Sequence, residues 1–448
     1  MDNRDSIDFA TTKVGRLFRQ MFIPTLIGMV SMVVLNITDG AFVGHGCGSD
    51  ALAAVNIAAP LFLITSGLGL MFGIGGSIVA SIHLAKGKAK AANINITQAV
   101  IGALIVGIVL SVSVLTFQRE VCMSFGCSER LLELACGYIR WIAIFVPMSM
   151  VSMVTMFIVR LDGSPRYAMG VHLFSATLNI ILDYVFIFPF GWGLEGAAMA
   201  TSFSFALGGL IALFYLFFRM ERLSLYRLRL TWKSLMLSLR NLGYQLKLGF
   251  SAMLGEAAIA AVIIVGNYVF MEYLGEDGVA AYSVACYCLP VVFMLGNAIV
   301  QSVQPIISFG YGGGANDRVR QACRIAFGTA VGAGILGMTF LFAGNRIISA
   351  VFLDSSCHAY ELCCEGLPYF SVCCLFVAVN IVAVGYYQSI EQSVRATVFT
   401  LLRGFVFVIP CFVLAPMWGG AAGIWLALPI AEALTLMVIS CTVLIKRR

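Results

Sequence analysis

The chain is poor in charged residues. Asp, Glu, Lys and Arg make up 11% of its 448 residues, against roughly 25% in an average soluble protein. Hydrophobic residues account for 60%. A water-soluble fold of this length needs far more polar side chains to cover its core, so the composition excludes an ordinary cytosolic enzyme and indicates that lipid covers the outside. We therefore expect an integral membrane protein.

Several motifs that carry chemistry are also missing. There is no GxxxxGK[ST] sequence, so ATP is not expected to be the energy source. The four His residues are scattered without ligand spacing, and the 14 Cys lie mostly inside apolar runs, where thiols behave as small hydrophobes. We expect no enzymatic activity, no cofactor, no metal site other than one for Na+, and no nucleic-acid partner.

Apolar runs dominate what is present. A spanning helix needs about 20 residues, and twelve runs of that size lie between charged or Gly- and Pro-rich breaks. The first six cover 20–44, 51–82, 94–117, 131–158, 167–190 and 196–218. The second six cover 248–271, 279–309, 325–344, 366–390, 396–415 and 421–445. The prediction is an all-α membrane protein with twelve transmembrane helices.

The two halves repeat each other at a constant offset of 227 residues, which is the spacing between Gly48 and Gly275. At this offset Gly87 meets Gly314, Gly107 meets Gly334, and Gly193 meets Gly420. Two six-helix copies in parallel orientation predict two lobes around a central cleft. We expect an N-terminal lobe at 1–218, a cytoplasmic linker at 219–247 and a C-terminal lobe at 248–448.

The linker is basic and carries one apolar stripe. Leu228, Trp232, Leu235, Leu239 and Leu242 recur every three or four residues, as on one face of a helix, among seven Lys and Arg residues. One interpretation is a helix that lies on an anionic inner leaflet. The other is a plain positive-inside connector without a regulatory role.

The distribution of positive charge predicts the topology. An even number of spans places both termini on one side, and all but four of the 28 Lys and Arg residues fall on that side. The four exceptions are Arg119, Arg130, Arg140 and Arg346. We expect a multi-pass protein of the plasma membrane, the inner membrane of a bacterium, with both termini in the cytoplasm.

Polar residues inside the predicted spans concentrate in the first half. Asn36 and Asp39 lie three apart on the first helix, and Asn179 and Asp183 lie four apart on the fifth, so each pair shares a helix face. Counted from the outer helix ends at 1.5 Å per residue, Asp39, Asp183 and Thr201 fall within roughly 8 to 11 Å of the outer boundary. These residues are therefore predicted to share one pocket.

The repeat does not copy this set. Asp39, Asn179, Asp183 and Thr201 correspond to Gly266, Val406, Pro410 and Leu428. A carboxylate in hydrocarbon costs at least about 2.5 kcal/mol, so each needs a partner or a role. Two carboxylates, an amide and a hydroxyl suit a hard monovalent cation such as Na+, or a pair that shares a proton. The alternative is that the two acids only cross-link helices.

Two further acids stand in the second half. Glu256, which aligns with Met29, is interpreted as an acidic group facing the cleft for cationic substrate or protons; the alternative is an ion pair within its own lobe. Asn36 is a further candidate for the same substrate or proton site. Glu432 in the last span is more simply explained as a paired residue.

Several segments resemble the multidrug and toxic compound extrusion (MATE) transporters over essentially the whole chain. They include Pro24 followed by Asp39-Gly-Ala-Phe-Val-Gly, Asn179-Ile-Ile-Leu-Asp183, and Gly193-Leu-Glu-Gly-Ala-Ala. The resemblance implies that Asp39, Asn179, Asp183 and Thr201 form the cation or proton site of the first lobe and that Glu256 is the acid of the seventh helix. No Asp or Glu lies between Gly366 and Ile390, where other branches carry one.

The combined interpretation is a secondary antiporter that exports amphipathic or cationic compounds in exchange for Na+ or H+. We expect a monomer in contact with membrane lipid and a small-molecule substrate. One alternative is a lipid-linked-oligosaccharide flippase, which should line its cleft with Lys or Arg. Another is a carrier of the major-facilitator type, although 84–90 lacks the acidic residue of its usual loop.

Overall fold

The computed structural model describes residues 7–125, 127, 129–228 and 231–445. Over these residues the chain is helical and contains no β-strand. It divides into two compact units: unit 1 comprises 7–253 together with Ser308–Asn316, and unit 2 comprises Leu254–Ile307 together with 317–445. The predicted all-α fold is confirmed.

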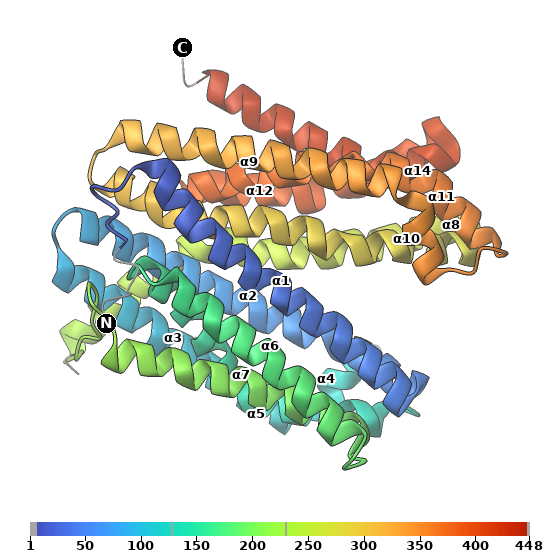
Figure 1. Cartoon of the computed structure of the whole chain (residues 1–448), viewed down its shortest axis with the longest axis horizontal. Coiled ribbons are helices and arrows are strands. Elements are labelled where there is room, and N and C mark those ends of the chain that lie inside the picture. Colours follow the sequence, from blue (N-terminus) through green and yellow to red (C-terminus); the bar gives the residue numbers. More distant parts are fainter. Residues whose placement is uncertain (1–6, 126, 128, 229–230, 446–448) are drawn as a thin grey trace. The chain divides into compact units, whose positions relative to one another are not determined.

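Unit 1 is built around helix α5, which packs against α2, α3 and α7, while α6 packs against both α1 and α7. Figure 1 shows these helices in blue to green. Their bounds are α1 Val14–Cys47, α2 Ser49–Ala85, α3 Ala89–Thr116, α4 Gln118–Ser124, α5 Leu132–Leu161, α6 Pro165–Ile187 and α7 Gly193–Phe218. The short α4 is additional to the predicted spans, so the predicted fifth and sixth spans are α6 and α7.

Unit 2 begins inside α8, a helix that starts in unit 1 and is interrupted by one non-helical residue, Gly275. Within this unit α12 packs against α13 and α14, and α11 packs against α14. The bounds are α8 Trp232–Gly312, α9 Asn316–Ala343, α10 Asn345–Phe352, α11 His358–Ser371, α12 Cys373–Ser389, α13 Ser393–Leu401, the π-helix η1 Leu402–Val406, and α14 Val408–Ile445.

The helices of the described residues account for twelve membrane spans. Nine are long and apolar enough to cross a bilayer, and the bent pair of α11 and α12 forms a tenth. Two of the nine, 232–312 and 393–444, contain 81 and 52 residues and break at Gly275 and Gly420, so each supplies two spans. The predicted number of spans is confirmed.

One predicted span is not a single straight helix. The run 366–390 is part of α11 and α12, which meet at Val372 with a bend of 41°. The last turn of α11 contains Pro368, and the hydroxyl of Ser371 donates to the Pro368 carbonyl at 2.6 Å. A proline and a hydroxyl bonded back along the helix both bend helices. Hydropathy alone does not register such a bend.

The internal repeat is visible in the backbone. Gly48 and Gly275 have φ of 87° and 66°, Gly87 and Gly314 have 69° and 71°, and Gly193 and Gly420 have 55° and 55°. All three pairs are offset by 227 residues, and each adopts the left-handed conformation at a helix junction, which residues with a Cβ rarely occupy. The two halves therefore turn at equivalent positions, as the repeat predicts.

Helix packing repeats as well. A Cβ added to Gly107 on α3 would lie 2.7 Å from the Cα of Pro147 on α5, and one added to Gly334 on α9 would lie 2.7 Å from the Cα of Leu375 on α12. Only glycine permits backbones to approach this closely. The third and ninth predicted spans thus cross their partner helices in the same way.

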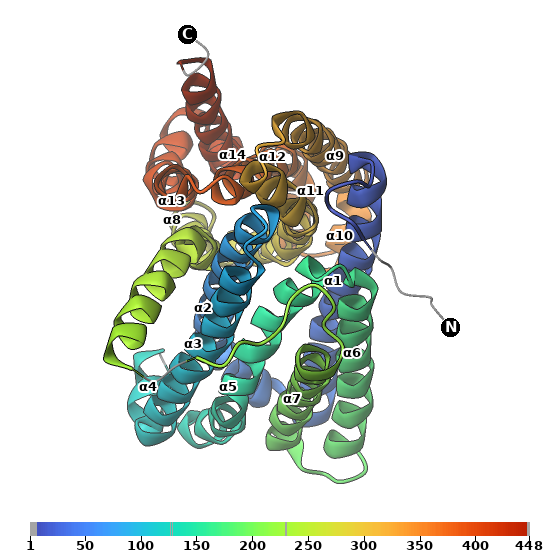
Figure 2. The same cartoon turned by 90° about the vertical axis from the view of Figure 1, so that its left-hand side faces the viewer.

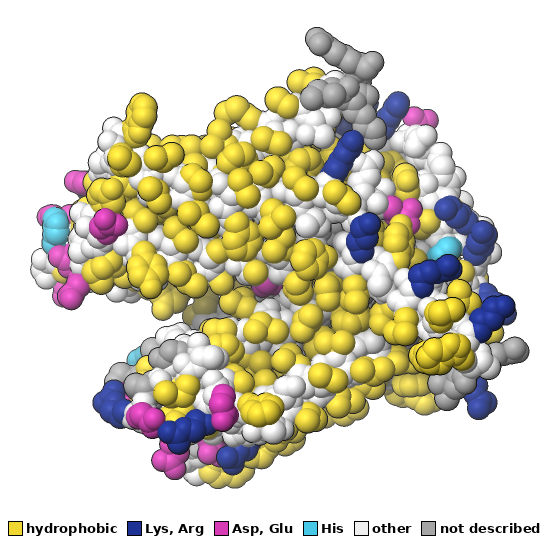
Figure 3. Space-filling model, turned by 180° about the vertical axis from the view of Figure 1, so that it is seen from behind, with side chains coloured by type: hydrophobic (Ala, Val, Ile, Leu, Met, Phe, Trp, Pro, Cys, Tyr) yellow, Lys and Arg dark blue, Asp and Glu magenta, His cyan; other side chains and the backbone are white. Residues whose placement is uncertain are grey.

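Side chains are distributed as a lipid-covered protein requires. In Figure 3 charged side chains gather toward the ends of the helices, and hydrophobic side chains cover the faces between them. Many of these exposed side chains are large, such as Phe217, Phe340 and Leu336, which are 66%, 68% and 72% exposed. The chain is a multi-pass membrane protein.

Candidate functional site

Close helix packing in unit 1 brings polar residues of α1, α6 and α7 together. A Cβ on Gly208 of α7 would overlap the hydroxyl of Ser175 on α6, and one on Gly28 of α1 would lie 3.3 Å from the ring of His172 on α6. Small residues at such contacts let helices approach until side chains from three of them meet. The three helices therefore enclose a common space.

The four predicted residues of the first lobe lie in that space. Asn179 and Asp183 are fully buried, Thr201 is 6% exposed, and Asp39 is half-buried. The amide Nδ2 of Asn179 donates to the hydroxyl Oγ1 of Thr201 at 3.2 Å. The carboxyl group of Asp39 interacts with the carboxyl group of Asp183 and with the side chain of Thr201. The carboxyl group of Asp183 also interacts with the side chain of Asn179. We call these four residues the oxygen cluster.

The oxygen cluster holds more acceptors than donors. Among the described residues, no hydrogen bond of good geometry reaches Asp39 Oδ1, Asn179 Oδ1 or either carboxylate oxygen of Asp183. Buried polar atoms in proteins are nearly always paired, because an unpaired one costs about 1 to 3 kcal/mol. An excess of buried acceptors with two acids is suited to a cation or to a proton shared by the acids.

The chemistry of the cluster limits which cation it can hold. Among the described residues, no group of three or more His, Cys, Asp or Glu side chains could hold a metal ion. Oxygen ligands alone, without thiolate or imidazole, favour a hard cation over a transition metal. The donor set therefore fits Na+ or H+ and does not fit a transition metal.

One residue near the cluster was not selected from the sequence. Tyr138 of α5 is 1% exposed and lies close enough to Asp39 and Asp183 to interact with both electrostatically. Its phenol is a polar group inside the predicted span 131–158, and this was the one feature of the sequence that could have marked Tyr138 as a site residue. Helix periodicity does not reveal which neighbour a single tyrosine faces.

Aromatic side chains stand next to the cluster toward the end of α1. The ring centroid of Phe42 is 6.4 Å from that of Tyr184 and 5.9 Å from that of Phe188, in an edge-on contact with the latter. Phe42 is one turn beyond Asp39, and Tyr184 directly follows Asp183. These rings hold α1 against α6 beside the acids.

The remaining candidates stand apart from the cluster. Asn36 is exposed, and among the described residues its side chain forms no hydrogen bond, although it lies one turn before Asp39 on α1. Glu256 of α8 belongs to unit 2 and is half-buried. Within the described part of the chain its carboxylate has neither an ion pair nor a hydrogen bond. The roles of both residues stay predictions.

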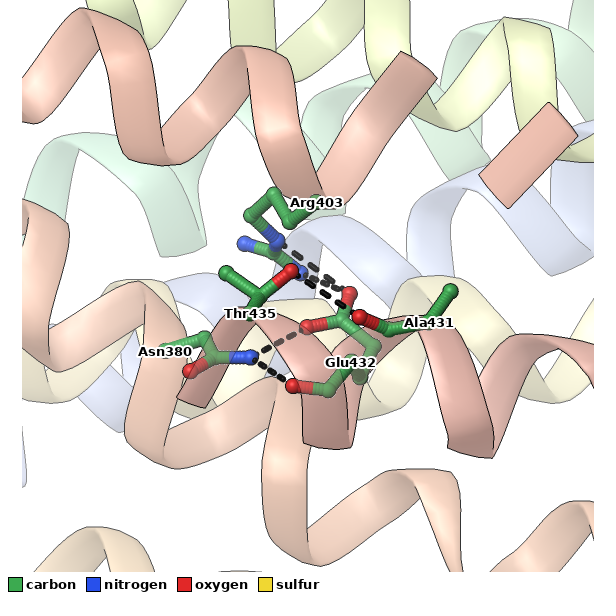
Figure 4. A network of polar contacts seen from close by, with 5 residues as sticks. All are labelled: Asn380, Arg403, Ala431, Glu432 and Thr435. Atoms are coloured by element: carbon green, nitrogen blue, oxygen red, sulfur yellow. Dashed lines mark hydrogen bonds and ion pairs between the residues drawn. The ribbon is translucent and has the colours of Figure 1, made fainter. Parts of the chain in front are cut away.

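Unit 2 contains a polar network of its own. Glu432 of α14 is 2% exposed, and its Oε1 accepts from Nη2 and Nε of Arg403 at 2.8 and 3.2 Å. Asn380 of α12 donates through Nδ2 to Oε2 of Glu432 at 2.7 Å and to its backbone carbonyl at 2.8 Å. Figure 4 shows these side chains pointing toward one another, with Thr435 one turn along α14.

Two arginines of the topology count lie inside the helices. Arg403, which falls within the predicted span 396–415 and was counted on the side of the termini, is 7% exposed and lies within η1, with its guanidinium 5.1 Å from the ring centroid of Phe293. Arg160, counted in the same way, is 3% exposed at the end of α5. Its guanidinium is 5.5 Å from the ring centroid of Phe157, so each of the two arginines lies over an aromatic ring.

The two networks are complementary within the repeat. Asn380, Arg403 and Glu432 correspond to Met153, Ala176 and Phe205 of the first half. Each unit therefore places buried polar groups where its copy has apolar or small side chains. In unit 1 the acids have no basic partner among the residues of the oxygen cluster, whereas in unit 2 the acid is neutralised by Arg403. Only the second arrangement pairs its acid with a base.

Twelve apolar spans in two parallel repeats are an architecture of membrane transporters. Residues 24–185 and 252–414 match the sequence pattern of the MatE family, and the chain belongs to that family. The predicted resemblance is thereby confirmed, and membership decides against a carrier of the major-facilitator type.

Individual relatives are distant in sequence. The multidrug export protein MepA of Staphylococcus aureus is 23% identical over 430 residues, which cover 95% of this chain and 92% of MepA. Among solved structures, a transporter of the MOP superfamily from Pyrococcus furiosus superposes with a TM-score of 0.88 at 21% identity and covers 96% of this chain and 95% of its own. The MATE transporter VcmN of Vibrio cholerae, solved as a point mutant, superposes with a TM-score of 0.87 at 20% identity. The match covers 96% of this chain and 97% of VcmN.

Proposed function

We propose that the chain is a secondary antiporter that exports amphipathic, often cationic, small molecules in exchange for Na+ or H+. The observation that carries the proposal is the oxygen cluster, in which two acids and an amide present buried acceptors without donors. The name of the staphylococcal relative, a multidrug export protein, supports the substrate class. The protein is proposed to act as a monomer without a cofactor.

The cluster suggests how an ion drives the cycle. Two interacting carboxylates in a buried space repel each other when both are ionised, so a cation or a proton that enters the cluster removes an unfavourable charge. The neutral cluster then allows α1 and α6 to pack differently from the charged one, and this difference biases the release of substrate. One charge that moves down 100 mV supplies about 2.3 kcal/mol.

We further propose that unit 1 and unit 2 carry the two lobes, 1–218 and 248–448, and that the segment between them is cytoplasmic. With both termini in the cytoplasm, the basic loops obey the positive-inside rule in a bacterial inner membrane. Asn36 and Glu256 are proposed as additional contacts for cationic substrate or protons. A role as a flippase for pyrophosphate-linked lipids is less well supported, because the buried Arg403 is already paired with Glu432.

The test uses vesicles that contain the full-length protein and are loaded with the amphipathic cation ethidium. A Na+ gradient and a pH gradient are imposed separately, and efflux is followed for the wild type and for Asp183→Asn. We expect one of the gradients to accelerate efflux by the wild type and neither to accelerate efflux by the variant.

The matched control is Asp50→Asn. Asp50 is an acid of the same unit, but its side chain is 49% exposed and paired with Arg130 at 2.8 Å, so coupling should survive its replacement. If Asp183→Asn couples as well as the wild type, the oxygen cluster is not the ion site. If neither gradient drives the wild type, the antiport proposal itself is wrong.

A further inference from the structure

The first four turns of α8, residues 232–247, lie on the outside of α2 and α3 in unit 1; we call them the linker helix. Figure 2 shows this segment in yellow-green beside those helices. The amide of Gln98 donates to the hydroxyl of Ser238 at 2.9 Å, and the amide of Gln245 donates to Asn95 Oδ1 at 2.8 Å. The polar side of the linker helix is thus bonded to α3.

Close packing holds the same side in place. A Cβ on Gly75 of α2 would overlap the backbone carbonyl of Gln245, and one on Gly102 of α3 would lie 3.0 Å from the side chain of Leu242. The approach leaves no room for the linker helix to rotate about its axis. The residues on its opposite side are therefore fixed in an outward orientation.

That outward side carries an apolar arc next to basic residues. Trp232, Leu235, Met236 and Leu239 are 80%, 47%, 61% and 61% exposed. At about 100° per residue these four positions fall within one arc of the helix, and the centre of that arc lies about 110° to 130° around the helix from Ser238 and Gln245. A helix of a soluble protein turns its polar side to water and its apolar side to the core. The linker helix instead turns Ser238 and Gln245 toward α3 and leaves the apolar arc exposed.

A row of cations borders the apolar arc. Lys233, Arg240 and Lys247 are exposed, and by the same helical spacing they lie together along one edge of that arc. Glu221 is the one acidic residue in 219–247. The turn between α2 and α3 adds the exposed Lys86 and Lys88, and the first turn of α3 adds the exposed Lys90. Positive charge therefore lies beside the exposed apolar surface at this end of unit 1.

We infer that the linker helix is an interfacial lipid-binding element, with its apolar arc among acyl chains and Lys233, Arg240 and Lys247 on the headgroups of anionic phospholipid. An apolar arc next to a cationic edge is the pattern of helices that lie in a membrane interface. Each basic side chain near an anionic surface favours binding by about fivefold, the equivalent of about 1 kcal/mol. The inference does not depend on the transport cycle.

The test measures which lipid lies beside Trp232. The full-length protein is reconstituted in two sets of vesicles that contain equal amounts of phosphatidylcholine and phosphatidylglycerol, with brominated chains on the phosphatidylglycerol in one set and on the phosphatidylcholine in the other. The fluorescence of Trp232 is isolated as the difference between the wild type and Trp232→Phe. We expect brominated phosphatidylglycerol to quench it more strongly.

Two variants and one condition sharpen the result. Lys233→Gln combined with Arg240→Gln should abolish the preference for phosphatidylglycerol, and so should 1 M salt, which shortens the screening length to about 3 Å. Arg130→Gln, at an exposed cation elsewhere in unit 1, should leave the preference intact. Dilution of the protein in lipid should change nothing.

Equal quenching by the two brominated lipids would overturn the specificity for anionic headgroups. Absence of quenching by either would overturn the interfacial position, because Trp232 would then face water or protein. Quenching that appears only on dilution would indicate that a second copy of the chain covers the arc, and the inference would fail.

Discussion

Replacement of either Arg403 or Glu432 by an apolar residue is predicted to destabilise unit 2 by about 3 to 5 kcal/mol. The two side chains are 8% and 2% exposed, and their closest atoms are 2.8 Å apart. With an effective dielectric constant of about 20, their attraction is roughly 6 kcal/mol. Removal of one partner forfeits this attraction and leaves the other as an uncompensated buried charge.

Removal of both partners should be much less damaging. The variant Arg403→Met/Glu432→Leu leaves no charge in the network and fills the space with side chains of similar size. Buried ion pairs replaced in this way are often neutral or even more stable. Asn380 keeps one acceptor, because its amide also bonds the backbone carbonyl of residue 432 at 2.8 Å. We expect the double variant to recover most of the lost stability.

The assay is equilibrium unfolding of the purified protein in mixed detergent micelles, followed by circular dichroism for the two single variants and the double variant. Arg324→Met, at an exposed cation of the same unit, is the control and should change stability by less than about 0.5 kcal/mol. Single variants as stable as the wild type, or a double variant whose loss equals the sum of the two single losses, would refute the reasoning.

Three further predictions concern unit 1. Asp162→Ala should lower stability by about 3 kcal/mol, measured as above, because this carboxylate accepts the hydroxyl of Tyr215 at 2.7 Å and three backbone N–H groups of 221–223. Thr201→Val keeps the shape of the side chain but removes the hydroxyl that accepts from Asn179. The half-saturating concentration of the coupling ion in the efflux assay should therefore rise roughly tenfold. An unchanged concentration would place Thr201 outside the site. Gly75→Ala should lower the midpoint of thermal unfolding, since the new methyl overlaps the linker helix. The control Gly255→Ala should not lower it, because nothing lies within 4 Å of the added methyl. Equal midpoints for the two variants would contradict the packing.

Much of the fold follows from the sequence because a bilayer restricts the chain to long apolar helices. Span number and the repeat were readable from hydropathy and from the 227-residue offset, and the paired left-handed glycines carry that offset into the backbone. The bend between α11 and α12 was not readable, since its cause lies in local bonding at Pro368 and Ser371.

The oxygen cluster was partly readable as well. Helical spacing placed Asn179 and Asp183 on one face, and the repeat marked them as additions to a common framework. The sequence did not reveal Tyr138, which comes from a different helix, or the pairing of Arg403, which falls within the predicted span 396–415, with Glu432. The sequence also predicted an apolar stripe on the linker without showing that its polar side is the covered one. Such facts depend on which face of a helix meets a neighbour.

The most direct test of ion coupling at Asp39 and Asp183 records both fluxes in the same vesicles. Ethidium efflux is measured together with Na+ or H+ uptake, for the wild type and for Asp39→Asn/Asp183→Asn. The account predicts that ion uptake accompanies ethidium efflux in the wild type and is absent from the double variant, whatever ethidium movement remains. Ion uptake by the double variant at the wild-type ratio to ethidium would contradict it.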